Sequence, residues 1–203
     1  MDKYCLVKTR VANLYKKPSF VSELVTQALI NESMLILEKS DNWYKVKQWD
    51  NYEAWVHNFY ININTNIDSF NSYKKYPFSN DNFIIYAKTF LDTPYLWGGK
   101  SSLGFDCSGF VQTIFKRFGI NFPRDAYQQI NIESLIEIEY VDLSIGDLFF
   151  FSDNKIVNHV AIYIGNGEII HSSGCVKIEK LKKNKKLYKK IHKIMSIRNI
   201  IDE

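Results

Sequence analysis

The spacing of apolar residues changes near residue 80 of this 203-residue chain, and that change constrains the fold more than any other feature. Residues 1–63 contain short runs rich in β-branched and aromatic residues, separated by polar turn clusters. The clearest runs are CLVKT, SMLILEK, WYKVKQW and EAWVHN. Several short strands at this spacing predict a small all-β barrel. Residues 64–79 lose the alternation and gain Asn, Ser and a Pro, which predicts a linker.

From Asn80 onward the pattern is typical of a mixed domain. NDNFIIYAKTFLDT places apolar residues at helical spacing, with Asn80 or Asn82 as the expected N-cap. A second helix is predicted after Asp106, with Gly119 as its C-terminal stop. IGDLFFF, NHVAIYIG and EIIHSS then follow as strands, and MSIRNI is a candidate for the last one. Helices followed by antiparallel strands predict an α+β domain over residues 80–203.

The formal net charge of +4 comes from one short stretch. Residues 177–193, called the basic segment below, hold nine Lys and one Glu, so the remainder carries 26−9 = 17 basic and 22−1 = 21 acidic residues. One interpretation is a site for an anionic partner such as a polyanion or a membrane surface. The other is a solvated edge beside the last strand, tied down by its apolar residues. We favour the second, because apolar residues recur through the segment at Ile178, Leu181, Leu187, Tyr188 and Ile191.

The chain has three widely spaced cysteines, Cys5, Cys107 and Cys175. An odd set with these spacings indicates neither a disulfide framework nor a zinc site. No apolar run has the length of a secretion signal or a membrane span. We therefore expect a reducing, cytoplasmic setting and no membrane insertion.

Cys107 lies at the predicted start of the second helix, directly after Asp106, which can cap that helix. Unpaired N–H groups and the helix dipole favour an anion there, so we expect a lowered thiol pKa and a reactive thiolate. Free cysteines are also commonly buried for packing. This segment by itself leaves both interpretations open.

Two histidines supply a candidate base. If Gly165, Asn166 and Gly167 form a three-residue hairpin loop, Ile164 pairs with Glu168 and Ala161 pairs with His171. His159 and His171 then share one sheet face on adjacent strands, within reach of each other. This pair could hold a metal, share a hairpin by coincidence, or form a relay in which Cys107 attacks, His159 carries the proton and His171 orients it. No Asp, Glu or Cys at ligand spacing joins the pair, which disfavours the metal.

Four stretches in succession resemble the motifs of the NlpC/P60 cysteine peptidases: TPYLWGGKSSLGFDCSGFVQ, PRDAYQQ, SIGDLFFF and NHVAIYIGNGEIIH. The resemblance covers residues 80–200 and implies a papain-like domain, helices packed on an antiparallel sheet. It implies that Cys107 is the nucleophile, His159 the base and His171 the orienting residue. It also implies that Tyr95 lies near the oxyanion. The all-β start resembles a bacterial SH3 domain (SH3b).

The order SH3b domain, linker, NlpC/P60 domain is similar to that of γ-D-glutamyl-L-diamino acid endopeptidases. This resemblance implies a peptidoglycan-derived substrate, L-Ala-γ-D-Glu-diamino acid, cleaved after D-Glu. We expect no metal or cofactor. In such enzymes Glu and Tyr side chains of the SH3b domain hold the free L-Ala amine. The best matches are Glu23 and Tyr52, although Glu23 could be a solvated turn acid and Tyr60 competes with Tyr52.

Three further residues are candidates for substrate binding. The resemblance implies that Asp106 and Ser108, which flank the nucleophile, line the site. The α-carboxylate of D-Glu needs a cation or N–H groups, and Arg124 is the candidate cation. The alternative for Arg124 is a surface arginine beside Pro123.

The hypothesis we favour is a cysteine endopeptidase that acts in cell-wall peptide recycling or remodelling. The absence of a signal favours recycling. One alternative is a related thiol amidase or acyltransferase that uses the same Cys–His pair on another amide or ester. Another is a wall-binding module without activity. No feature predicts a nucleic-acid partner, and the oligomeric state is left open.

Overall fold

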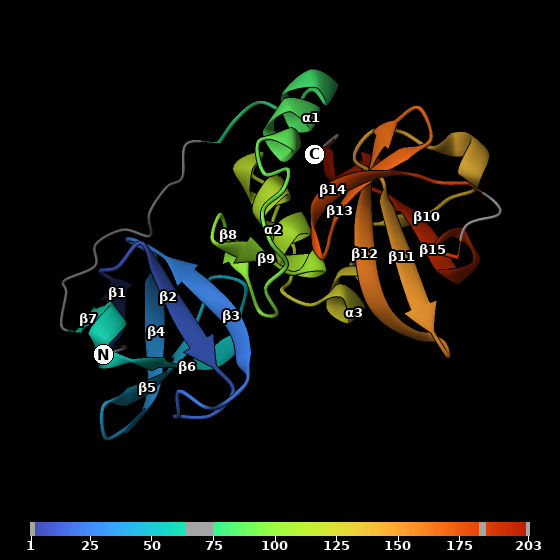
Figure 1. Cartoon of the computed structure of the whole chain (residues 1–203). Coiled ribbons are helices and arrows are strands. Elements are labelled where there is room, and N and C mark those ends of the chain that lie inside the picture. The colour runs from blue at the N-terminus through green and yellow to red at the C-terminus, as the bar shows by residue number, and fades with distance from the viewer. Residues whose placement is uncertain (1–2, 64–74, 183–185, 202–203) are drawn as a thin grey trace.

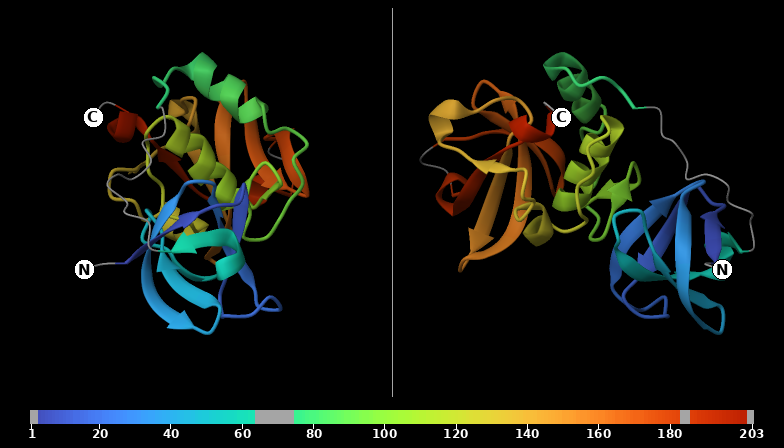
Figure 2. Two further views of the ribbon diagram at one scale, coloured as in Figure 1. Left: turned by 90° about the vertical axis from the view of Figure 1, so that its left-hand side faces the viewer. Right: turned by 180° about the vertical axis from the view of Figure 1, so that it is seen from behind.

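The computed structural model describes residues 3–63, 75–182 and 186–201 of the chain. A β-rich N-terminal part lies beside a part in which helices pack against a second sheet (Figure 1). Helix α2 lies between the two sheets, with α1 above it at the top of the view, as the view from behind also shows (Figure 2). The arrangement is the α+β class that the sequence predicts. The predicted linker, 64–79, lies outside the described residues except for its last five positions.

The N-terminal sheet has seven strands in the order β3-β2-β6-β5-β4-β1-β7. Its small core is built from inward-facing residues of these strands, including Val7, Leu14 and Val56. The four predicted runs form strands, whereas β2 and β3 were not predicted. In β3 the alternation is masked because Thr26 and Gln27 are buried against the second part of the chain. The strands are β1 Tyr4–Val7, β2 Val11–Tyr15, β3 Leu24–Leu29, β4 Ser33–Ser40, β5 Trp43–Lys47, β6 Glu53–His57 and β7 Ile61–Ile63, with the 3-10 turn Asn58–Tyr60 before β7.

The second part packs its helices against a six-stranded antiparallel sheet of order β10-β15-β11-β12-β13-β14. The core between them contains Phe83, Phe110, Phe115, Val160 and Ile170. The helices are α1 Asn80–Lys88, α2 Cys107–Arg117, α3 Ala126–Gln129 and α4 Arg198–Ile201. The strands are β10 Ile136–Glu137, β11 Leu148–Asp153, β12 Ile156–Gly165, β13 Glu168–Ser173, β14 Cys175–Lys180 and β15 Ile191–Ser196, and the short pair β8 Lys100–Ser101 and β9 Gly104–Phe105 precedes α2.

Two local predictions for this part need correction. The N-cap of α1 is Ser79, whose hydroxyl accepts the Asn82 N–H at 3.2 Å, and not Asn80 or Asn82. The stretch MSIRNI is not one strand: β15 ends at Ser196 and α4 begins at Arg198. Ser196 is the last paired residue of β15, and the buried Ile197 joins the strand to α4.

The β12–β13 hairpin differs from the predicted three-residue loop. Gly165, not Ile164, pairs with Glu168, so the loop is the dipeptide Asn166-Gly167 with positive φ at both residues. Asn-Gly favours such a turn because both residues adopt left-handed backbone easily. A bulge between Tyr163 and Gly165 absorbs the extra residue. Beyond the bulge the pairs are Ile162 with Ile170 and Tyr163 with Ile169, the register that the sequence predicts around His171.

The basic segment begins as β14, continues outside the described residues at 183–185, and returns through the 3-10 turn Tyr188–Lys190 into β15. Leu181, Leu187, Tyr188 and Ile191 belong to an apolar cluster on the outer face of the sheet, and Ile178 packs on the main core. Lys190 pairs with Asp153 at 2.6 Å and Lys193 pairs with Glu137 at 2.6 Å. The anchoring role expected of these apolar residues is confirmed.

Polar contacts join the two parts of the chain. The Lys100 N–H donates to Gln27 Oε1 at 3.0 Å, and Gln112 Nε2 donates to Asp50 Oδ2 at 2.7 Å. Lys116 Nζ lies 2.9 Å from Glu32 Oε1, in an ion pair largely shielded from solvent. These contacts hold β3 against β8, and the β3–β4 and β5–β6 turns against α2.

Within the described ranges, no helix combines the length and apolar character needed to cross a membrane. The same ranges contain no group of three or more His, Cys, Asp or Glu side chains placed to hold a metal ion.

Candidate active site

Cys107 is the first residue of α2, because the residue before it, Asp106, caps the helix. The Asp106 side chain caps the helix by accepting the Gly109 N–H at 2.7 Å. Gly109 is required because a Cβ there would lie 2.2 Å from the Gly99 carbonyl oxygen. The sulfur of Cys107 accepts hydrogen bonds from the backbone of Ser108 and of Val160, the residue after His159. Cys107 therefore lies against β12 at Val160, the residue that follows the candidate base.

The electrostatic setting of Cys107 differs from the sequence prediction. Burial, followed by the neighbouring Asp106 carboxylate, raises the pKa of Cys107 to about 11. The backbone hydrogen bonds from Val160 and Ser108 act in the opposite direction but are outweighed. The expectation of a lowered thiol pKa was therefore wrong. A thiol that is 8% exposed loses more from desolvation of its anion than it gains at a helix start.

His159 and His171 meet across the β12–β13 pair. His159 Nε2 lies 2.7 Å from His171 Nδ1, and the second nitrogen of His171, Nε2, lies 2.8 Å from Glu179 Oε2. Burial and the nearby His171 lower the pKa of His159 to about 3. The pKa of His171 is also lowered, chiefly by burial, although the Glu179 carboxylate opposes that shift. Both imidazoles are therefore neutral at neutral pH.

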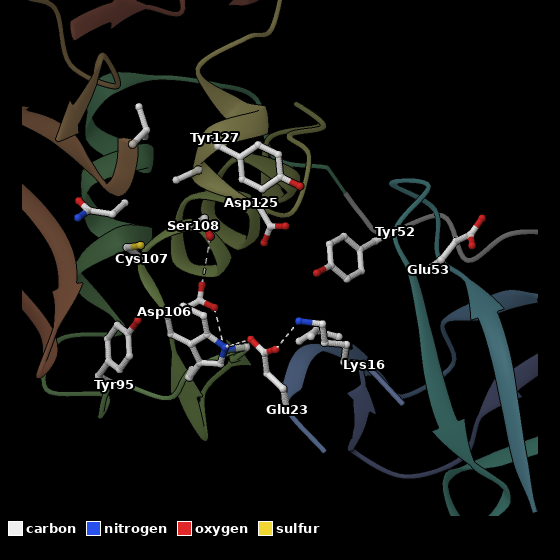
Figure 3. A pocket seen from close by; sticks show the side chains of 16 residues that line it. Lys16, Glu23, Tyr52, Glu53, Tyr95, Asp106, Cys107, Ser108, Asp125 and Tyr127 are labelled. Atoms are coloured by element: carbon white, nitrogen blue, oxygen red, sulfur yellow. Dashed lines mark hydrogen bonds and ion pairs between the residues drawn. The ribbon is translucent and has the colours of Figure 1, made fainter. Parts of the chain in front are cut away.

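Tyr95 lies in the loop before β8, at the rim of the pocket that contains Cys107 (Figure 3). Its backbone is held by the Tyr95 N–H, which donates to the Gly174 carbonyl at 2.9 Å. Burial, and then the proximity of Cys107, raise the pKa of Tyr95 to about 12. The phenol thus stays protonated at neutral pH and can donate a hydrogen bond toward the sulfur's side of the pocket.

A pocket of about 470 Å³ lies between the two parts of the chain. Cys107, Tyr95 and Ser108 line it from the α2 side, and Glu23 and Tyr52 line it from the N-terminal sheet (Figure 3). The structure thus brings both predicted SH3b residues to the pocket of the candidate nucleophile. Tyr60 does not line this pocket and packs on the core of the N-terminal sheet.

Glu23 is held by one partner from each part of the chain. Its Oε2 lies 3.1 Å from Lys16 Nζ, and its Oε1 accepts the Trp97 Nε1–H at 3.0 Å. These hydrogen bonds, that from Lys16 first, lower the pKa of Glu23, so the carboxylate is charged at neutral pH. The Glu23 side chain remains 40% exposed, which leaves room for a ligand cation.

The position of Arg124 contradicts its predicted role. Arg124 is 1% exposed, so it is neither a surface arginine nor a pocket-lining one. Its Nη1 and Nη2 donate to Asp106 at 3.0 and 2.5 Å, Nη1 also donates to Ser108 Oγ at 3.1 Å, and Nε donates to Thr26 Oγ1 at 3.1 Å. Arg124 therefore binds Asp106 and Ser108, the two neighbours of Cys107, from inside the protein and not from the pocket.

Asp106 and Ser108 do line the pocket, but both are tied to the protein. The two Asp106 oxygens accept hydrogen bonds from Gly98, Gly109 and Arg124, and the Ser108 hydroxyl lies 3.4 Å from Asp106 Oδ1. Direct contact of these two residues with substrate stays a prediction. Their visible contribution is to hold the loop at Gly98 against the start of α2.

Several residues around the site were not predicted. Lys16, Glu53, Trp97, Asp125, Tyr127 and Asn158 also line the pocket. Trp97 and Asp125 carried a signal, since both lie inside the motifs YLWGG and PRDAY. Glu179 carried none, because it is the single acid within the basic segment and a surface ion pair is the simplest interpretation of such a residue.

Comparison with known proteins agrees with this arrangement. Residues 92–195 match the NlpC/P60 family, and residues 14–58 match the bacterial dipeptidyl-peptidase SH3 domain. The chain is 36% identical over 174 residues to a protein of Bacillus cereus named gamma-D-glutamyl-L-lysine dipeptidyl-peptidase. The aligned residues cover 84% of this chain and 50% of that relative. A protein of the same name from Bacillus subtilis is 44% identical over 86 residues, 41% of this chain and 28% of that one.

A solved structure gives the same result for the fold. An NlpC/P60 family protein from Bacillus cereus superposes with a TM-score of 0.55 at 30% sequence identity, covering 95% of this chain and 62% of that one. The chain thus spans half or less of the curated relatives named above. The family match covers residues 92–195, which include Cys107, His159 and His171. This chain therefore belongs to the NlpC/P60 family and carries a bacterial SH3 domain ahead of the family's domain.

Proposed function

We propose that this chain is a cysteine endopeptidase that cleaves the amide between D-Glu and the diamino acid of peptidoglycan stem peptides. The observation that carries the proposal is the pocket in which Cys107 of α2 faces Glu23 of the SH3 domain. One wall supplies the candidate nucleophile, whose sulfur contacts the backbone of Val160 next to His159, and the other supplies a fixed anion. The names of the two Bacillus relatives support this substrate class.

In the proposed mechanism the resting pair is a neutral thiol and a neutral imidazole. His159 removes the proton from Cys107 as the sulfur attacks the γ-carbonyl of D-Glu, which gives a tetrahedral oxyanion. The Cys107 N–H and the Tyr95 hydroxyl donate to that oxyanion. Loss of one such donor typically lowers turnover by about 10²–10³.

The second half of the reaction returns the enzyme to its starting state. Protonated His159 gives its proton to the departing amine of the diamino acid, and the C–N bond breaks to leave a thioester on Cys107. His159 then removes a proton from water, whose oxygen attacks the thioester carbonyl. The C–S bond breaks, the dipeptide leaves as a carboxylic acid, and the sulfur regains its proton from His159.

The pH dependence of thiol alkylation tests the neutral resting pair. The pKa values of about 3 for His159 and about 11 for Cys107 leave both groups uncharged between these limits. In the Cys175→Ser background, the rate of iodoacetamide reaction at Cys107 should rise about tenfold per pH unit from about pH 6 to about pH 9, because the thiolate fraction does. A rate that is constant across this range would show a preformed thiolate–imidazolium pair and contradict the prediction.

Glu23 is proposed to bind the free ammonium of the N-terminal L-Ala. The exposed side of its carboxylate faces the pocket while Lys16 and Trp97 hold it in place. Glu23→Gln should raise KM for a peptide with a free N-terminus by about tenfold, because a hydrogen bond between charged groups is lost. KM for the N-acetylated peptide should not change. Equal effects on both peptides would place the ammonium elsewhere.

Defined peptides test the function itself. Incubation with L-Ala-γ-D-Glu-L-Lys and its diaminopimelate counterpart, with products identified by mass, should yield L-Ala-D-Glu and the free diamino acid. Release after any other residue, or no cleavage of either peptide, would contradict the proposal. Transfer of the dipeptide to an added amine in preference to water would instead indicate an acyltransferase.

We also propose that the substrates are free stem peptides, as in recycling within the cytoplasm. The SH3 domain places the Glu23 carboxylate at the pocket, where it suits a free N-terminal ammonium. In intact wall the nitrogen of L-Ala is part of an amide bond, so the stem peptide has no such ammonium. Released peptides should therefore be cleaved much faster than purified intact peptidoglycan. Comparable rates on both would favour wall remodelling.

A further inference from the structure

We propose that Glu179 is a positioning residue that sets the tautomers of both active-site histidines, so that His159 presents an unprotonated nitrogen to Cys107. The inference deepens the proposed function and rests on it for its kinetic consequence. Its structural content concerns a chain of three side chains, Glu179, His171 and His159, which can be tested without substrate.

Glu179 lies on β14, the strand next to the one that carries His171. It pairs with Ile169 across the β13–β14 ladder, which puts its side chain on the same face as His171. Glu179 Oε2 lies 2.8 Å from His171 Nε2, and His171 is 1% exposed. The contact thus joins a buried imidazole to a carboxylate that is itself only 29% exposed.

The hydrogen-bond inventory of these groups determines where each proton sits. An ionised carboxylate only accepts, so the His171 Nε2 that faces Glu179 must carry a hydrogen. A neutral His171 then has a lone pair on Nδ1 and accepts from His159 Nε2, 2.7 Å away. A neutral His159 that donates through Nε2 has its lone pair on Nδ1. In the proposed mechanism this lone pair accepts the Cys107 proton.

Without Glu179 the opposite arrangement satisfies the His–His contact equally well. His171 would donate from Nδ1 to His159 Nε2, and His159 would carry its hydrogen on Nδ1. In that form His159 has no lone pair for the thiol proton. A histidine alone, as the third member of the relay, accepts either arrangement, whereas a carboxylate behind it allows one.

The charges around His171 support an ionised Glu179. Lys177, the cross-strand partner of His171, lies with its Nζ 3.4 Å from Glu179 Oε2. Burial raises the pKa of Glu179, but the hydrogen bond from His171 and the neighbouring Lys177 ammonium lower it by more, so the net shift is downward. On the opposite side, His171 faces His159, whose ring packs against Phe151. The Glu179 carboxylate is therefore the charged group in direct contact with the two imidazoles, through His171 Nε2.

The experiment compares Glu179→Leu, Glu179→Gln and a matched control, Glu168→Leu, whose acid lies on β13 beside the turn. The ¹⁵N chemical shifts of the ring nitrogens report which of them carry hydrogen, and the chain has 4 His to assign. In wild type and Glu168→Leu, we expect hydrogen on Nε2 of both His159 and His171. Glu179→Leu should populate the Nδ1–H forms and lower kcat/KM by about 10–100-fold, with little change in KM. Glu179→Gln, whose amide oxygen can accept the same bond, should keep the wild-type tautomers and lose less activity.

The inference is overturned if Glu179→Leu keeps the wild-type tautomers, whatever happens to activity, because a merely structural role would give that result. It is also overturned if the tautomers change while kcat/KM does not. If Glu179→Leu fails to fold, Glu179→Gln with a thermal melt like wild type still tests the assignment through its tautomers and turnover. If no variant cleaves the peptides, including wild type, the proposed function has failed, but the tautomer comparison still decides the role of Glu179.

Discussion

Cys107→Ser should abolish peptide cleavage, with a loss of about 10⁴-fold or more in kcat/KM, while the protein keeps its fold. The alcohol replaces the thiol in nearly the same space at the start of α2, so the Asp106 cap and the packing of the helix remain. A serine hydroxyl is much harder to ionise than a thiol, and the site already makes ionisation of the thiol costly. His159 alone therefore cannot generate a useful nucleophile from the alcohol.

Cys175→Ser is the matched control for this experiment. Cys175 is half-buried at the start of β14 and does not line the pocket, so its replacement should leave turnover near that of wild type. Circular dichroism and thermal melting establish that both variants are folded. Wild-type turnover by Cys107→Ser would show that the sulfur is not the nucleophile, and the proposed mechanism would be wrong.

Arg124→Met should destabilise the protein by about 3–5 kcal/mol, because it leaves the Asp106 carboxylate with an uncompensated charge in a nearly closed site. Asp106 would keep its bonds from Gly98 and Gly109 but lose its cation, and β3 would lose the bond from Arg124 to Thr26. The measurement is the urea concentration at the midpoint of unfolding, compared between variants whose m-value, the dependence of unfolding free energy on urea, is unchanged. We expect cleavage to fall as well, since Asp106 caps the helix that carries Cys107.

A double variant separates loss of the charge pair from loss of packing. Asp106→Asn combined with Arg124→Met removes both charges. The double variant should therefore lose less unfolding free energy than the sum of the losses of the two single variants. Lys45→Met, which breaks the exposed pair with Glu53, should shift the midpoint little. Additive effects at Asp106 and Arg124 would show that their charges are not coupled.

Much of the catalytic half of the site could be predicted because its signals are local. The start of α2 depends on an Asp106 side chain that bonds an N–H three residues later, and strand alternation puts His159 and His171 on one face. The prediction survived an error in the turn: the bulge before Gly165 restored the expected register at His171. The ionisation state of Cys107 could not be predicted in this way, because it depends on how deeply the folded protein buries the sulfur.

The amino-acid sequence by itself determined the change from strands to helices near residue 80, the helix start at Cys107 and the histidine hairpin, since each depends on residues a few positions apart. Only the tertiary structure decided three contacts of the site. Arg124 binds Asp106 from inside the protein, Glu23 lines the same pocket as Cys107, and Glu179 lies within hydrogen-bond distance of His171. Thr26 and Arg124 are 98 residues apart in the chain, and Trp97 is 74 residues from Glu23. Such contacts leave no periodic pattern, because they arise where two separately patterned surfaces pack together and exclude water.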